Sequence, residues 1–357
     1  MRRDFLEIDT SFQGAPFDQP ITTQDIEALR VLLTGDSVID WRRMVLPNLR
    51  SVDQFLATHL IDPSDPRDRE RLRYVFNEAV SYLEEHLRLR FPIELRNPRD
   101  VRDVFLWANH ADGFRRTQLL SCVVLKLMHV IHHMEAADLK FRLPVSEAQY
   151  MRLAHRRILQ QADRMRELGL PLLAFYGSTK SRSAMITKLL AKKKAVAAQI
   201  FDKLRYRLVV PHHEDIARTL AWLTRNVFPF NYVVPSESHN NLLDPVQLLD
   251  RLDQPDERDL IEERPLTFDD VCTKNEFSGA SYRAINWICD YPVQIPDTVD
   301  NPFSTELGRV IQVNVEFQIL DEETGKRNEQ GENAHRLYKA RQQRQVAARL
   351  KRGFPDP

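Results

Sequence analysis

The stretch 176–210, YGSTKSRSAMITKLLAKKKAVAAQIFDKLRYRLVV, concentrates the side chains best suited to bind a polyphosphate. Residues 171–210 hold nine Lys or Arg against one acid, Asp202, a net charge of +8 in a chain with 51 basic and 51 acidic residues. On a helix, the spacing of Lys180, Lys188 and Lys192 places their ammonium groups on one face, where they could converge on one anion. A turn at 177–179 would add backbone N–H groups at the positive end of that helix. The alternative is a solvated basic helix face.

Two carboxylates stand alone in apolar runs with strand character. Asp202 lies in IFDKLRYRLVV and Glu316 in VNVEFQIL. A carboxylate on a sheet is costly unless it is paired or holds a cation. Two such acids on neighbouring strands would form a Mg²⁺ site whose metal also bridges bound phosphates. Pairing with nearby arginines is the competing interpretation, the candidates being Arg205, Arg207 and Arg309.

Composition indicates a soluble, globular protein of up to two domains, with 43% hydrophobic and 29% charged residues in 357. The most apolar run, 119–130, is short and interrupted by Ser121, Lys126 and His129, so no membrane span is expected. The start MRRDFLEIDT lacks the apolar stretch of a signal peptide. Three widely spaced cysteines without CxxC pairing favour reduced thiols and a cytoplasmic location.

The elements that must position these residues form an α+β chain. Residues 1–169 read as an all-helical domain, with apolar residues at three- and four-residue spacing in segments near 23–34, 51–60, 66–88, 98–108, 113–138 and 146–168. Residues 170–352 mix helices with strands near 199–210, 228–235, 282–295 and 309–320, which predicts a mixed sheet, followed by a basic terminal helix. Residues 236–270 interrupt this domain as an insertion with eleven acids against three arginines.

Five motifs in order resemble those of the RelA/SpoT-type alarmone synthetase domain, the (p)ppGpp synthetase, which has a nucleotidyltransferase-like fold. A Lys-rich helix leads into an I-[FY]-D-x-x-x-x-R strand. FNYVVP, SYRAIN and VEFQIL are similar to the family's D-Y-I-x-x-P, G-Y-x-S-x-H and E-x-Q-I-R-T strands. NEQGENAHRLYK is similar to its A-E-x-x-x-A-A-H-W-x-Y-K helix. The resemblance covers roughly residues 170–345.

The resemblance implies a pyrophosphotransferase that moves the β,γ-pyrophosphate of ATP to the 3′-hydroxyl of GDP or GTP, the alarmone synthesis of the stringent response. A tRNA 3′ end is a related acceptor, which the basic terminal helix would favour, and a homo-oligomer is possible. Asp202 and Glu316 would be the catalytic and Mg²⁺-binding residues, with Glu316 aligning or activating the hydroxyl. Nucleotide binding would fall to Lys180, Arg182, Lys188, Arg207, Tyr282 (stacked on the guanine), Gln318, His335 and Lys339.

Several positions depart from the family's motifs. An arginine that clamps the ATP base in the family is Ser178, and a small residue three positions after the metal-binding Asp is Arg205. The motif's Ser, His and Arg are Ala284, Asn286 and Leu320. Ser236 replaces a Lys, for which Lys274 is the candidate substitute. These changes keep a second hypothesis open, a catalytically silent nucleotide-binding regulatory or interaction module.

A cluster of histidines, His129, His132 and His133, lies in a predicted helix with Glu135 and Asp138. His129 and His133 are four residues apart, a spacing that can bind a metal. The adjacent His-Asp pair of the hydrolase domain that accompanies long family members is absent from this segment. Ordinary helix packing is the preferred interpretation, and no hydrolase is predicted.

Overall fold

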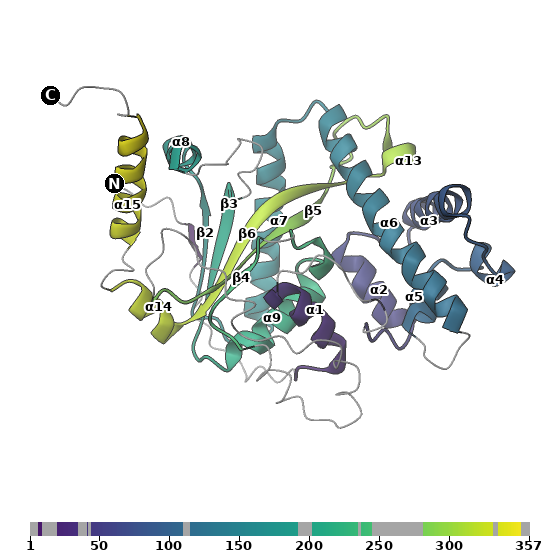
Figure 1. Ribbon diagram of the computed structural model, residues 1–357, viewed down its shortest axis with the longest axis horizontal. Coiled ribbons are helices and arrows are strands. Elements are labelled where there is room, and N and C mark those ends of the chain that lie inside the picture. The colour runs from purple at the N-terminus through teal and green to yellow at the C-terminus, as the bar shows by residue number, and fades with distance from the viewer. Residues whose placement is uncertain are drawn as a thin grey trace.

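The computed structural model describes residues 6–8, 20–34, 41, 44–109, 115–191, 202–234, 237–244, 281–330 and 335–350. Within these ranges the chain is an α+β fold with one mixed sheet, as predicted. Helices gather at both sides of the sheet (Figure 1). Residues 245–270 of the predicted insertion and the lysines at 192–194 lie outside the described residues, so predictions about them stay predictions. The start of that insertion is described, and His239–Asn240 forms a strand of the sheet instead.

The N-terminal half is a series of helices whose ends carry recognisable caps. The Asp65 side chain accepts the Arg67 N–H at the start of α3, with Pro66 in the first helical position. Ser146 and Gln149 form a capping box at the start of α7. The helices are α1 (Thr23–Thr34), α2 (Leu49–Thr58), α3 (Pro66–Leu87), α4 (Ile93–Arg96), α5 (Arg102–Asn109), α6 (Arg115–Arg142) and α7 (Glu147–Glu167).

The sheet has the strand order β1-β2-β3-β6-β5-β4. Only β3 and β6 run parallel, and the other neighbours are antiparallel. The strands are β1 (Leu6–Ile8), β2 (Ala174–Thr179), β3 (Leu204–Val210), β4 (His239–Asn240), β5 (Ile285–Gln294) and β6 (Val310–Asp321). The helices of this half are α8 (Arg182–Ala191), α9 (Asp215–Asn226), α13 (Ser304–Leu307), α14 (Glu322–Asn328) and α15 (His335–Leu350).

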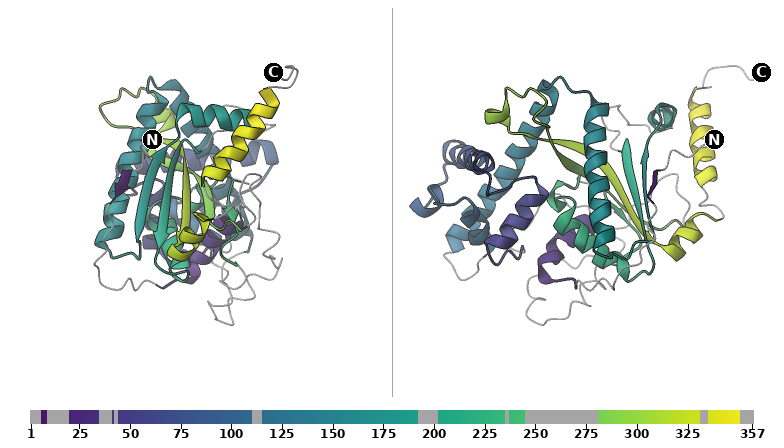
Figure 2. Two further views of the ribbon diagram at one scale, coloured as in Figure 1. Left: turned by 90° about the vertical axis from the view of Figure 1, so that its left-hand side faces the viewer. Right: turned by 180° about the vertical axis from the view of Figure 1, so that it is seen from behind.

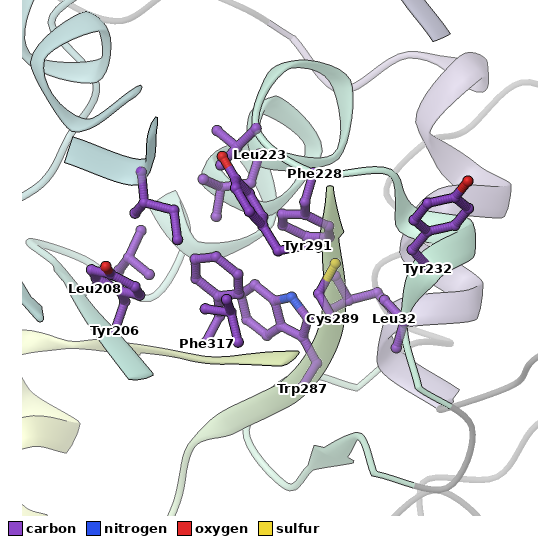
Figure 3. Packing of buried hydrophobic residues seen from close by; sticks show 14 of the residues in the cluster. Leu32, Tyr206, Leu208, Leu223, Phe228, Tyr232, Trp287, Cys289, Tyr291 and Phe317 are labelled. Atoms are coloured by element: carbon purple, nitrogen blue, oxygen red, sulfur yellow. The ribbon is translucent and has the colours of Figure 1, made fainter. Parts of the chain in front are cut away.

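One face of the sheet is the apolar core. Alternating residues of β3 and β6 are buried, so the side chains between them project from the opposite face. Phe317 lies at the centre, with its ring stacked near those of Tyr206, Phe228 and Trp287 (Figure 3). Helix α7 covers this face, where its His155 ring contacts the Tyr206 hydroxyl at 2.6 Å, and it crosses the strands in the rear view (Figure 2).

A second apolar cluster joins α2, α3, α5 and most of α6. The packing groups α7 with the sheet rather than with this cluster, while the predicted domain boundary at 169 stays a prediction. Among the described helices, α6 would by length and composition alone be able to cross a membrane, a test that core helices also pass. His129 and His133 on α6 pack their rings against Tyr232, and Glu135 pairs with Arg71.

Three local predictions were wrong. Residues 177–179 are the end of strand β2, paired with β3, rather than a turn with free N–H groups. FNYVVP begins as a 3-10 helix at Phe230–Tyr232, and only Val233 makes an isolated bridge, to Cys289. The N-terminal half is not purely helical, because β1 pairs with β2.

Gly177 shows why β2 needs a small residue opposite Tyr206, its partner across the β2–β3 pair. A Cβ added at Gly177 would lie 2.8 Å from Tyr206 Cε1. The Tyr206 ring cannot yield easily because Phe175 and Phe317 stack on it. Gly177→Ala should therefore lower the free energy of unfolding by about 1–3 kcal/mol, measured by urea denaturation. Adding Tyr206→Leu should relieve part of the loss; strictly additive effects would contradict the steric explanation.

Candidate active site

The basic residues of the site come from the junction of β2, β3 and α8. The Lys180 N–H donates to the Lys203 carbonyl at 2.8 Å, which extends the β2–β3 pairing by one step beyond the strand. Ser181 then begins the turn into α8, with its hydroxyl accepting the Ala184 N–H at 3.3 Å. Lys188 lies two turns along that helix. The strand end and the helix thus bring Lys180 and Lys188 to the same place.

Asp202 is the carboxylate on which these two lysines converge. Lys180 Nζ donates to its Oδ2 atom, and Lys188 Nζ lies 2.8 Å from its Oδ1 atom. Burial by itself would raise the pKa of Asp202, but the two ammonium groups outweigh burial and lower it from 3.8 to about 2. Burial lowers the pKa of Lys180. Asp202 is therefore an anion held between two cations, immediately before β3.

This arrangement predicts how acid acts on stability. A carboxyl whose folded pKa lies below its unfolded value stabilises the fold above pH 3.8, and that contribution is lost as the pH falls towards 2. The wild type should therefore lose more unfolding free energy than Asp202→Asn between about pH 5 and 2 in urea titrations. Parallel pH profiles of the two proteins would contradict the ion-pair assignment.

Glu316 projects from the middle of β6 on the face of the sheet opposite the apolar core. Its register partners are Arg205 on β3 and the buried Ile288 on β5. Among the described residues, no group hydrogen-bonds its buried Oε2 atom. Burial raises the pKa of Glu316, and the negative charge of Asp202 adds to the effect while Arg205 and the two lysines oppose it. The two candidate metal ligands are thus close enough to influence each other.

The next row of side chains on this face is a polar patch two residues further along β6. Gln318 Nε2 donates to the Tyr282 hydroxyl at 2.9 Å and to Asn286 Oδ1 at 2.6 Å. Arg207 is the register partner of Gln318 on β3 and is exposed. The structure therefore brings the predicted residues Arg207, Tyr282 and Gln318 together, beside Glu316.

The remaining predicted residues lie further out. Arg182 is exposed at the first position of α8, and Lys339 is exposed on α15. The side chain of His335 lies outside the described residues. Helix α15 packs beside α8 (Figure 1), where Arg349 Nη1 donates to the Leu190 carbonyl at 2.6 Å. The structure thus brings α15 to the helix that carries Lys188.

The departures from the motifs take two forms. Ala284 and Leu320 are buried, so the positions where the motif has polar side chains here belong to the core. Asn286 instead stays polar and supports Gln318. Ser178 and Arg205 are cross-strand neighbours, and Arg205 Nε donates to Ser178 Oγ at 2.9 Å. Local sequence pattern cannot indicate this contact, because it depends on the pairing of β2 with β3.

The donor set fits a Mg²⁺ ion that completes its coordination with ligand phosphates. Magnesium is typically held by one or two carboxylates plus phosphate oxygens and water. Asp202 and the unbonded Oε2 of Glu316 match that requirement. Within the described residues no group of three or more His, Cys, Asp or Glu side chains could hold a metal by itself. The site therefore suits a metal that arrives with its phosphorylated ligand.

A scan against protein-family models gives no match, and no curated protein sequence matches. Similar solved structures include small alarmone synthetase 1 of Bacillus subtilis bound to its product pppGpp. The two sequences are 16% identical, the match covers 57% of this chain and 89% of that chain, and the TM-score is 0.33. Small alarmone synthetase 2 of Bacillus subtilis has 15% identity, coverages of 57% and 82%, and a TM-score of 0.26. A GTP pyrophosphokinase family protein of Streptococcus pneumoniae has 11% identity, coverages of 56% and 82%, and a TM-score of 0.28. These proteins are of the kind that the motifs resemble.

Proposed function

We propose that the chain is an ATP-dependent pyrophosphotransferase that modifies the 3′-hydroxyl of a guanosine nucleotide, GDP or GTP, or of a tRNA 3′ end. The observation that carries the proposal is the convergence of Lys180 and Lys188 on Asp202 beside Glu316, whose Oε2 atom has no partner among the described residues. Cations that can clamp phosphates and a carboxylate that can accept a proton are what such a transfer needs.

In the proposed reaction the acceptor oxygen attacks the β-phosphorus of ATP. A bond from that oxygen to the β-phosphorus forms, the bond between the β-phosphorus and the oxygen of the α-phosphate breaks, and AMP leaves. The Glu316 carboxylate accepts the hydroxyl proton. Lys180, Lys188 and Arg207 bind phosphate oxygens, with Arg182, His335 and Lys339 as further nucleotide contacts.

Mg²⁺, held by Asp202 and Glu316, would offset negative charge on the phosphates when bound. Tyr282 and Gln318 are joined by a hydrogen bond and would hold the acceptor base, with Tyr282 stacking on it. The protein would act in the cytoplasm without a membrane and could form a homo-oligomer.

Incubation with γ-labelled ATP and Mg²⁺ tests the activity and the acceptor together. Label should move to GDP or GTP, or to the RNA fraction if a tRNA 3′ end is the acceptor. Residues 326–352 hold nine Lys or Arg against two Glu, which favours trying the RNA. Absence of labelling from every acceptor, with no ATP binding, would overturn the proposal.

A second candidate is a catalytically silent nucleotide-binding module. The observation that favours it is the burial of Ala284 and Leu320 at positions where the motifs carry polar side chains. This candidate predicts nucleotide binding that Asp202→Asn and Glu316→Gln barely alter and no turnover in the wild type. Turnover that either substitution abolishes would reject it.

A further inference from the structure

We infer that Arg205, anchored by Ser178, binds a phosphoryl group of the nucleotide as a further cation of this site. The inference rests on the proposed function and deepens it. The sequence departs from the resembled motifs at both positions. Arg205 stands where the motif has a small residue, and Ser178 stands where the motif has an arginine. The position of Arg205 in the sheet, its hydrogen bond and its charge surroundings support the assignment.

The sheet register fixes where Arg205 lies. Its cross-strand neighbours are Ser178 on β2 and Glu316 on β6, so all three side chains project from the same face. Lys180 follows Ser178 by two residues and therefore shares that face. Arg205 thus stands between Ser178 and Glu316 in one row across three strands, about one strand spacing (~5 Å) from each neighbour.

The hydrogen bond to Ser178 determines how the guanidinium is presented. Nε donates to Ser178 Oγ at 2.9 Å, which ties one edge of the planar group to β2. The other edge, formed by the two terminal nitrogens, keeps the geometry for a bidentate contact with a phosphate. A lysine at this position would keep the charge but lose both the anchor and the paired donors.

Two partly buried arginines elsewhere in the described chain are neutralised by carboxylates. Arg102 pairs with Asp53 and Asp100, and Arg309 pairs with Asp65 and Asp68. Arg205 is partly buried as well, yet it makes no ion pair with any described carboxylate, although Glu316 is its register partner. The positive charge of Arg205 is therefore available to an anionic ligand.

The charge of the site indicates an anionic ligand rather than a neutral one. Lys180, Lys188 and Arg205 supply three positive charges, and Asp202 and Glu316 supply at most two negative charges. Because the guanidinium lies beside Glu316, which would hold the metal together with Asp202, the ligand group it meets is a phosphate of the nucleotide rather than the adenine ring.

Calorimetric titration with ATP, inorganic tripolyphosphate and adenosine tests the assignment. Arg205→Ala should weaken ATP and tripolyphosphate binding by about 10- to 100-fold and leave adenosine unaffected. Arg205→Lys should recover only part of the loss. Ser178→Ala, which keeps the guanidinium and removes its anchor, should weaken binding by a few-fold. Arg152→Ala, an exposed arginine on α7, is the matched control and should bind as the wild type does.

The double variant Ser178→Arg/Arg205→Ser moves the guanidinium across the strand pair and should restore most of the tripolyphosphate affinity. Circular dichroism and thermal melting establish that each variant is folded. If Arg205→Ala does not fold, the few-fold loss expected for Ser178→Ala tests the same assignment. If the wild type binds tripolyphosphate and Arg205→Ala binds it equally well, the role of Arg205 is overturned but the proposed function is not. A wild type that binds neither ATP nor tripolyphosphate would overturn the proposed function and this inference with it.

Discussion

Replacing Glu316 with glutamine should abolish transfer while leaving nucleotide binding nearly intact. The amide keeps the size of the side chain but cannot accept the proton of the acceptor hydroxyl or contribute a negative charge to the metal. We expect turnover to fall by about 10³-fold or more, measured as labelled product from γ-labelled ATP. The ATP dissociation constant in the absence of metal should change little.

The same substitution has an expected signature in stability. Because burial raises the pKa of Glu316, the wild type loses stability as the pH rises above the ordinary value of 4.5, and the loss is complete once the pH exceeds the folded pKa. Glu316→Gln should therefore gain stability relative to the wild type as the pH rises above 4.5. Glu306→Gln, at an exposed residue before β6, is the control and should alter neither property. Full activity in Glu316→Gln would refute its catalytic role.

Asp202→Asn should also reduce transfer by about 10³-fold, but for a different reason, the loss of one of the two metal-binding carboxylates. The substitution leaves Lys180 and Lys188 without their shared carboxylate. Binding of metal-free ATP should therefore be retained or become tighter, because both ammonium groups are then available to phosphates. The Mg²⁺ concentration needed for half-maximal ATP binding should rise, or the dependence should disappear.

Asp163→Asn is a suitable control, since Asp163 is an exposed acid paired with Arg166 on α7. It should bind ATP and respond to Mg²⁺ as the wild type does. If Asp202→Asn keeps wild-type turnover and Mg²⁺ dependence, Asp202 is only a partner of the lysines and the metal assignment fails.

Much of the fold follows from local sequence pattern. The long helices α3, α6 and α7 carry apolar residues at helical spacing over several turns, and β5 and β6 carry long runs rich in β-branched and aromatic residues. Strand β2 could not be recognised in this way. AFYGST is short and ends in small polar residues, and it is a strand because β3 supplies partners more than twenty residues away.

Site residues could be predicted where a charged side chain stands alone in an apolar run. Contacts that depend on the register of paired strands could not be predicted. Asp202 and Glu316 stand out because each is the single acid of an apolar run, and the structure brings them close enough for Asp202 to raise the pKa of Glu316. The Ser178–Arg205 contact is different, because it needs the pairing of β2 with β3. Without that register, the two residues read as unrelated losses rather than as one contact.

The most direct test of the proposed function follows the fate of both parts of ATP in one reaction. The protein, Mg²⁺ and ATP labelled at the γ-phosphate are incubated with GDP, GTP or tRNA, and AMP and labelled acceptor are quantified together. The proposed function predicts AMP and 3′-pyrophosphorylated acceptor in equal amounts from the wild type and neither from Glu316→Gln. Release of ADP and phosphate instead of AMP, or no labelled acceptor from any of the three, would contradict it.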